Sequence, residues 1–64
     1  MQNQDDSLIP LWKVMNNTWV QVEGIDEPIL FKHLDGMYSL CYHENEPVHI
    51  AAFAKVKVLH KNKG

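Results

Sequence analysis

Several features of secreted and membrane proteins are scarce or missing in this 64-residue sequence. It has one cysteine, so no disulfide can form within the chain, whereas small secreted domains usually carry several. No apolar run approaches the roughly 20 residues that cross a bilayer. The N-terminus also lacks the basic-then-apolar layout of a signal peptide. We therefore expect a cytoplasmic protein that does not associate with membranes.

Arginine is also absent, since all six basic residues are lysines. The net charge of −2 is unevenly distributed along the chain. Residues 1–47 hold all eight acidic residues and two lysines, a net −6, whereas residues 48–64 hold four lysines and no acid, a net +4. Nucleic-acid-binding domains usually have a basic charge overall and use arginine for bidentate phosphate contacts. The charge therefore argues against a general nucleic-acid binder.

The length allows one domain at most, and it limits the hydrophobic core. A chain this short buries only about 60% of the surface that its unfolded form exposes. The polar opening at 1–7 predicts a flexible N-terminal tail, and 61–64 predicts a frayed C-terminus. We expect a single small β-domain over residues 8–60. Because the chain begins at Met1, we also expect a complete small gene product.

No catalytic or metal-binding pattern stands out. Glycine-rich phosphate loops and internal repeats are missing, and Cys41 lacks the helix N-terminus or nearby base that activates a nucleophile. Zinc sites typically have short spacings between their ligands in the sequence. Such spacings are missing for Cys41 and His43, and also for His33 and His49, which a closed barrel would bring near them. We therefore predict no enzymatic activity, no cofactor and no bound metal, and we interpret Cys41 as a buried packing residue.

Apolar residues mostly recur at a spacing of two, which indicates half-buried β-strands. Asn16-Asn17 predicts a hairpin turn between strands at 11–15 and 18–23, and Asp35-Gly36 predicts one between strands at 29–34 and 37–42. Two shorter strands are expected at 48–50 and 55–59. Alternating lysines in the last strand are typical of a protected sheet edge. Between these two strands, 51–54 predicts one helical or 3₁₀ turn, with Phe53 plugging the core.

A two-residue turn at Asp35-Gly36 predicts which side chains share a face of this hairpin. Its pairing puts one set on the first face: Ile29, Phe31, His33, Tyr38, Leu40 and Tyr42. The other face then holds Leu30, Lys32, Leu34, Met37, Ser39 and Cys41. Which of these two faces is exposed stays open, because both contain apolar residues.

About five short strands need closure to avoid exposed edges, which favours an all-β, partly open barrel. The ending VHIAAFAKVKVL, a strand, a turn carrying Phe53 and a valine-rich final strand, resembles the close of an SH3-like small barrel. The resemblance implies a five-stranded SH3-like fold with a one-turn helix before the last strand, and it implies a binding module. An OB-like barrel, or a three-stranded sheet with one helix over 49–57, is the alternative.

Aromatic residues provide the clearest functional signal, because tryptophan and tyrosine dominate binding hot spots. We predict a non-enzymatic module that docks on a larger protein and modulates it, as accessory subunits and phage or bacterial regulators do. A second copy of the chain is another candidate partner, since a thin core gains stability by burying more surface. The candidate protein-binding residues are Trp12, Trp19, Tyr38, Tyr42 and His33.

Single-stranded nucleic acid is the alternative ligand. Small barrels hold single strands by stacking bases on aromatic rings beside a positively charged groove. Trp19, Tyr38 and Tyr42 would stack the bases in that case. Lys32, Lys55 and Lys57 would contact the phosphates.

Overall fold

The computed structural model describes residues 8–59, which form an all-β fold. The flexible ends expected at 1–7 and 61–64 lie outside the described residues. Six strands and one short 3₁₀ helix, η1, are present over these residues, where the SH3-like resemblance implied five strands. Their bounds are β1 Ile9–Pro10, η1 Leu11–Lys13, β2 Thr18–Val22, β3 Ile29–Asp35, β4 Tyr38–His43, β5 Glu46–Val48 and β6 Lys55–Val58.

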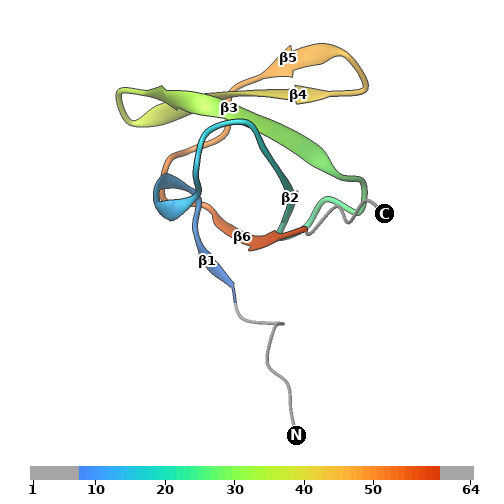
Figure 1. Cartoon of the computed structure of the whole chain (residues 1–64), viewed down its shortest axis with the longest axis horizontal. Helices are drawn as coiled ribbons and strands as arrows, with labels where there is room; N and C mark the ends of the chain where they lie inside the picture. The colour runs from blue at the N-terminus through green and yellow to red at the C-terminus, as the bar shows by residue number, and fades with distance from the viewer. Residues whose placement is uncertain (1–7, 60–64) are drawn as a thin grey trace, which may run out of the picture.

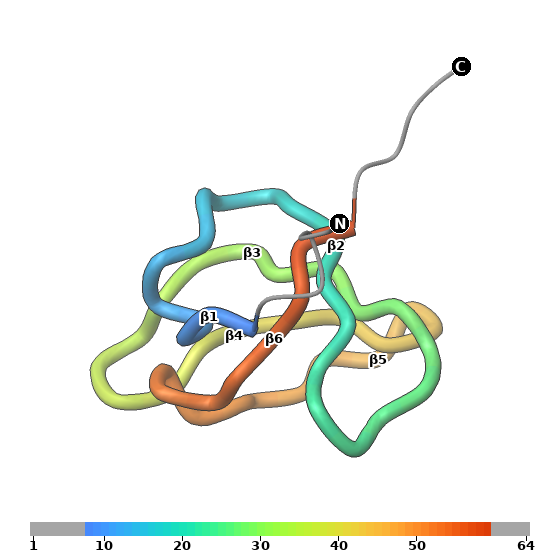
Figure 2. The backbone as a smooth tube through the Cα atoms, turned by 90° about the horizontal axis from the view of Figure 1, so that it is seen from below, coloured from blue at the N-terminus to red at the C-terminus, as the bar shows by residue number. Residues whose placement is uncertain are grey.

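All six strands belong to one antiparallel sheet in the order β1-β6-β2-β3-β4-β5. The sheet curves strongly, so that β6 and β1 lie across from β3 and β4 (Figure 1). The tube view shows the same curl from below (Figure 2). It is not closed into a barrel, because β1 and β5 stay at opposite edges of the strand order. The expected all-β class is confirmed, but the expected barrel closure is not.

The core fills the concave side of this curved sheet. Val20 and Val22 alternate along β2 with Trp19 and Gln21, so that only the valines are buried. This alternation is what a strand with one face on the core requires. The buried cluster consists of Leu11, Val14, Val20, Val22, Ile29, Phe31, Cys41 and Val56.

The first expected hairpin is wrong. Residues 11–13 form η1 instead of a strand, and β2 pairs with β3 and β6. Leu11 and Val14 are buried while Trp12 and Lys13 are exposed, a spacing of three that suits a helical turn better than a strand. The Asn16-Asn17 turn does exist, with Asn17 at φ 62°, but it connects η1 to β2.

The second expected hairpin is confirmed, but with a different register. Asp35 pairs with Tyr38, so the turn residues are Gly36 and Met37, with Gly36 at φ 65°. A β-bulge between Phe31 and His33 then shifts the pairing again. Because strand residues alternate between faces, a one-residue slip exchanges the two faces. The buried side therefore combines Ile29 and Phe31 of β3 with Ser39 and Cys41 of β4, two pairs that the expected register put on opposite faces.

The last third of the chain brings two further corrections. Residues 51–54 form a turn closed by the Ala54 amide donating to the Ala51 carbonyl at 3.0 Å, and Phe53 is 62% exposed, so it does not plug the core. The final strand, β6, lies between β1 and β2, so its lysines do not protect a sheet edge.

β4 and β5 form an additional hairpin, which the expected strands do not include. Glu44 and Asn45 both have positive φ, at 55° and 69°, as a type I′ turn requires. The strand expected at 48–50 accordingly begins earlier, at Glu46.

Candidate binding surfaces

One row of side chains crosses the convex face of the sheet. Trp19 on β2 is the register partner of Leu30 on β3, which is in turn the partner of Tyr42 on β4. Directly opposed residues in antiparallel strands point to the same face with their Cβ atoms about 5 Å apart. Because the adjacent residues Val20, Ile29 and Cys41 are buried, this row points away from the core.

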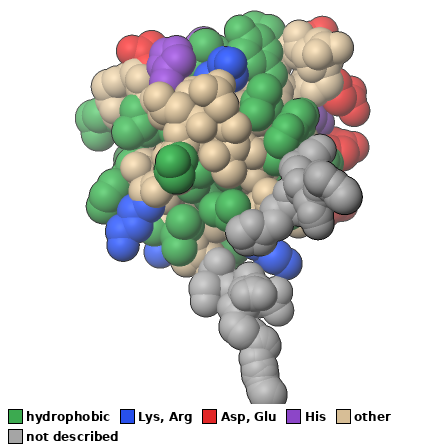
Figure 3. Space-filling model, in the orientation of Figure 1, with side chains coloured by type: hydrophobic (Ala, Val, Ile, Leu, Met, Phe, Trp, Pro, Cys, Tyr) green, Lys and Arg blue, Asp and Glu red, His purple; other side chains and the backbone are tan. Residues whose placement is uncertain are grey.

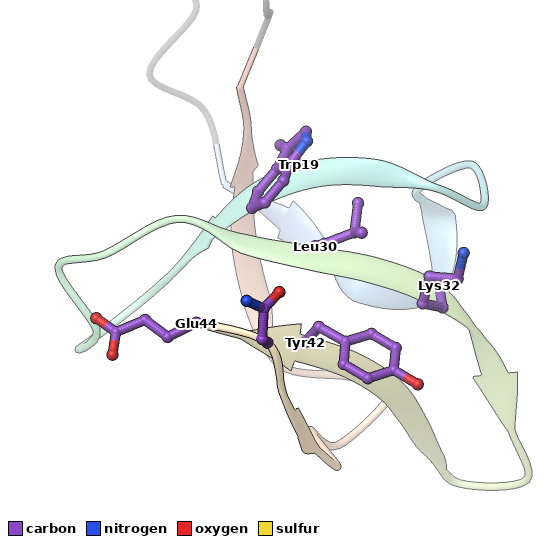
Figure 4. A pocket seen from close by; sticks show the side chains of 6 residues that line it. Trp19, Leu30, Lys32, Tyr42 and Glu44 are labelled. Carbon is purple, nitrogen blue, oxygen red and sulfur yellow. The ribbon is translucent and has the colours of Figure 1, made fainter.

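The row lines an open hollow of about 430 Å³ (Figure 4). Its other lining residues are Lys32 on β3 and the turn residues Glu44 and Asn45. We call the surface formed by these six residues the platform. Its centre is aromatic and aliphatic, and its rim carries one positive and one negative side chain. Trp19 is 36% exposed, so the rim leaves its ring accessible.

The β-bulge adds polar groups to the same face. His33 pairs with Leu40, and Phe31 pairs with Cys41, so Lys32 is the extra residue in β3. A bulge re-aims the side chains beside it. His33 is exposed, and its Nδ1 lies 2.9 Å from the carbonyl oxygen of Leu34.

A second surface lies at the end of the molecule where η1, the β3–β4 turn and residues 51–54 meet (Figure 1). The Trp12 amide donates to the Ala52 carbonyl at 2.9 Å, and the Ala52 amide donates to the Met37 carbonyl at 2.9 Å. Trp12, Met37 and Phe53 are 52%, 70% and 62% exposed. We call these three residues the apolar end.

A shallow hollow of about 370 Å³ is associated with the β3–β4 turn and is lined by Asp35, Tyr38 and His49. Asp35 and Tyr38 flank the turn that carries Met37, and Tyr38 is 57% exposed. An isolated β-bridge joins Tyr38 to Ala51. Ala51 precedes Ala52, whose backbone hydrogen bonds connect the segments of the apolar end. This hollow therefore borders the apolar end and not the platform.

Cys41 is fully buried, and its Sγ lies 3.2 Å from Ser39 Oγ. Ser39 Oγ also donates to the Ile50 carbonyl at 2.8 Å. Burial raises the pKa of the Cys41 thiol, partly offset by the Ser39 hydroxyl. A raised pKa reduces the thiolate fraction, which is the reactive form. The thiol therefore has the properties of a packing residue.

One group of potential metal ligands occurs among residues 8–59: Glu27, His43 and Glu44. His43 Nε2 lies 2.8 Å from Glu27 Oε1, and the three ligand atoms lie within 4.8 Å of one another. Both glutamates are exposed, so water competes for them. The hydrogen bond that His43, at the end of β4, donates to the Glu27 carboxylate holds these two residues together without an ion.

The structure brings only part of the predicted site together. Trp19, Tyr42 and Lys32 share the platform, whereas Trp12 lies at the apolar end. Lys57 is the register partner of Gln21, on the side of β2 away from β3, and Lys55 on the same strand is exposed.

Phe53 was expected in the core and is exposed, whereas Met37 and Leu30 belong to a hairpin face whose exposure the sequence left open. The turn register and the bulge expose Met37 and place Leu30 outward, and neither feature follows from a hydrophobicity pattern.

The sequence matches no protein-family model, and no curated protein or solved structure is significantly similar to it. Over residues 8–59, no helix has the length and apolar character needed to span a membrane. Function must therefore be argued from the two surfaces themselves.

Proposed function

We propose that this chain is a non-enzymatic protein-binding module and that the platform is its docking surface. The observation that carries the proposal is the Trp19–Leu30–Tyr42 row, which presents two aromatic rings and an aliphatic side chain on the outside of a rigid sheet. In a domain with so thin a core, inward-facing positions would bury these side chains more effectively. Their outward placement is what a docking surface needs.

The composition of the platform fits a protein better than a polyanion. Binding hot spots are enriched in tryptophan and tyrosine and are surrounded by polar residues that exclude water. Lys32 and Glu44 supply opposite charges at the rim, so they favour a partner that carries both signs. A partner segment with an apolar centre and flanks of both charges would match the apolar centre and the charged rim of the platform.

The wider biological role is part of the same proposal. The turn at 51–54, followed by β6 returning beside β2, supports an SH3-like plan for the sheet. Such domains mostly act as accessory modules, and we place this chain among cytoplasmic regulators of a larger protein, of the kind that phages and bacteria encode. The single, buried cysteine is compatible with a reducing compartment.

The test is affinity capture from the source cell with a paired set of variants. Trp19→Ala combined with Tyr42→Ala removes both rings of the platform, and Trp12→Ala removes an equally large exposed ring elsewhere. We expect wild type and Trp12→Ala to capture the same partner and the double variant to lose it. Thermal melts followed by circular dichroism verify that each variant folds. Equal capture by the folded double variant would refute the platform as the docking surface.

Single-stranded nucleic acid is a second candidate, favoured by the position of Lys32 beside Trp19 and Tyr42 in one hollow. Bases stacked on the two rings would place a phosphate near the Lys32 ammonium. Titration of fluorescent oligonucleotides at about 50 and 200 mM salt separates the candidates, since phosphate contacts weaken steeply with salt. Binding that is salt-sensitive and lost in Lys32→Gln would establish nucleic acid as the ligand. No binding at either salt concentration would remove this candidate.

A further inference from the structure

The apolar end is a preformed surface distinct from the platform. Its three side chains come from η1, the β3–β4 turn and the 51–54 turn, and two backbone hydrogen bonds through Ala52 fix these segments to one another. In the space-filling view, hydrophobic side chains gather along the left margin, with an acidic side chain above them and basic side chains below (Figure 3). Because these backbone segments are already fixed, burying the surface costs little backbone conformational entropy.

We propose that the apolar end is the interface of a two-fold symmetric homodimer. A second copy of this chain is the occupant that both the area and the charges of the surface fit. The platform lies on the convex face of the sheet, so this dimer would carry two platforms.

The area is that of a small, reversible interface. Taking about 200 Å² for a large apolar side chain, the exposed fractions of Trp12, Met37 and Phe53 give roughly 370 Å² per copy. Two facing copies would bury roughly 740 Å² of apolar surface. A specific interface needs about 1,200 Å² in total, of which about 60% is apolar. The apolar end thus supplies the centre of an interface at the lower limit of this range, and we expect a dissociation constant in the micromolar range.

The charges beside the apolar end are complementary under a two-fold axis. Lys13 follows Trp12, and its Nζ lies 5.6 Å from the centre of the Trp12 ring. The Met37 segment is bonded to the opposite backbone group of Ala52 from Trp12, and Asp35, two residues before Met37, lines the neighbouring hollow with Tyr38 and His49. In a two-fold dimer, each contact occurs twice with the copies exchanged. Lys13 of each copy would therefore approach the hollow that contains Asp35 of the other.

Edge-to-edge pairing is a poorer route to a dimer. The edge strand β5 has only three residues, and they include Glu46 and Pro47. A short edge with a charge and a proline is poorly suited to pairing with another strand. The opposite edge, β1, offers two residues.

Sedimentation equilibrium from about 1 to 500 µM tests the proposal on the full chain. We expect wild type to pass from monomer to dimer over this range and Phe53→Asp to remain monomeric. Lys13→Asp should weaken the dimer at least tenfold, because each of the two attractions to Asp35 becomes a repulsion between carboxylates. The double variant Lys13→Asp/Asp35→Lys should return to within about threefold of wild type.

Two controls match these variants in chemistry but not in place. Leu8→Asp puts a charge on another exposed apolar residue, and Lys32→Asp makes the same charge change on the platform; both should dimerise as wild type does. Circular dichroism verifies that Phe53→Asp is folded. A wild-type chain that stays monomeric up to 500 µM would overturn the proposal, as would a dimer that both Phe53→Asp and Lys13→Asp leave intact. If the wild-type chain stays monomeric, the apolar end would instead be a surface for a different protein.

Discussion

Phe31 and Phe53 provide a matched comparison of what lies inside and outside this fold. Phe31 is 1% exposed and pairs with Thr18 on one side and Cys41 on the other, whereas Phe53 is 62% exposed in a turn. A buried Phe→Ala substitution costs about 3–5 kcal/mol. A domain of this length has a total stability of roughly 3–10 kcal/mol. Phe31→Ala is therefore too severe, and leucine is the better probe at both positions.

We predict that Phe31→Leu lowers the free energy of unfolding by about 1–2 kcal/mol, because the smaller side chain leaves a cavity in the core. Phe53→Leu should change it by less than about 0.5 kcal/mol, as surface substitutions do. With a urea m-value of about 1 kcal/mol per molar, the midpoint should fall by about 1–2 M for Phe31→Leu. Urea unfolding of a dilute sample, followed by tryptophan fluorescence, measures both. If Phe53→Leu shifts the midpoint as far as Phe31→Leu does, the placement of the core is wrong.

Three further predictions concern the core and the β3–β4 turn. The pKa of the Cys41 thiol is raised above its ordinary value of 9.0, so the unfolded chain loses this proton at a lower pH than the folded chain. The free energy of unfolding should therefore fall as pH rises above about 9. Urea midpoints measured from pH 7 to 10.5 should decline less in Cys41→Ala than in wild type. Ser39→Ala leaves the Ile50 carbonyl without its hydroxyl donor and should cost about 1–2 kcal/mol in the same assay, a neutral result counting against the buried hydrogen bond. Gly36→Ala places a side chain at φ 65°, with open space around its Cβ. Backbone strain alone should therefore lower the free energy of unfolding by about 1 kcal/mol, measured as a lower thermal midpoint. An unchanged midpoint would mean that the turn has another conformation.

The strands that the sequence predicted well are those with clear alternation and a strong turn. The β3–β4 hairpin follows from Asp35-Gly36 between two apolar runs, and β6 follows from Val56 and Val58 between lysines. Both features are local, so they can be read from neighbouring residues. Their exact pairing cannot, because the β-bulge in β3 depends on contacts with β4 and shifts every side chain beyond it.

The segment at 11–15 shows why the candidate site was only partly predicted. Over five residues, the alternation of a strand and the spacing of three of a helical turn are hard to tell apart. The burial of Leu11 also depends on hydrogen bonds from η1 to residues 52 and 54, which are distant in sequence. Pro10 before η1 and the Leu11–Val14 spacing were the available signals. A hairpin of strands 11–15 and 18–23 would have put Trp12 and Trp19 on the same face, whereas the fold assigns the two rings to different surfaces.

This separation of the two tryptophans allows the most direct test of the platform. In a two-dimensional ¹H–¹⁵N spectrum each indole N–H gives its own signal, which Trp12→Phe and Trp19→Phe assign. The captured partner is added at constant protein concentration. We predict that the Trp19 indole signal shifts or broadens on binding, together with the backbone amides of Leu30 and Tyr42, while the Trp12 signal stays in place. A perturbation of Trp12 without one of Trp19 would contradict the central claim that the convex face of β2, β3 and β4 is the docking surface.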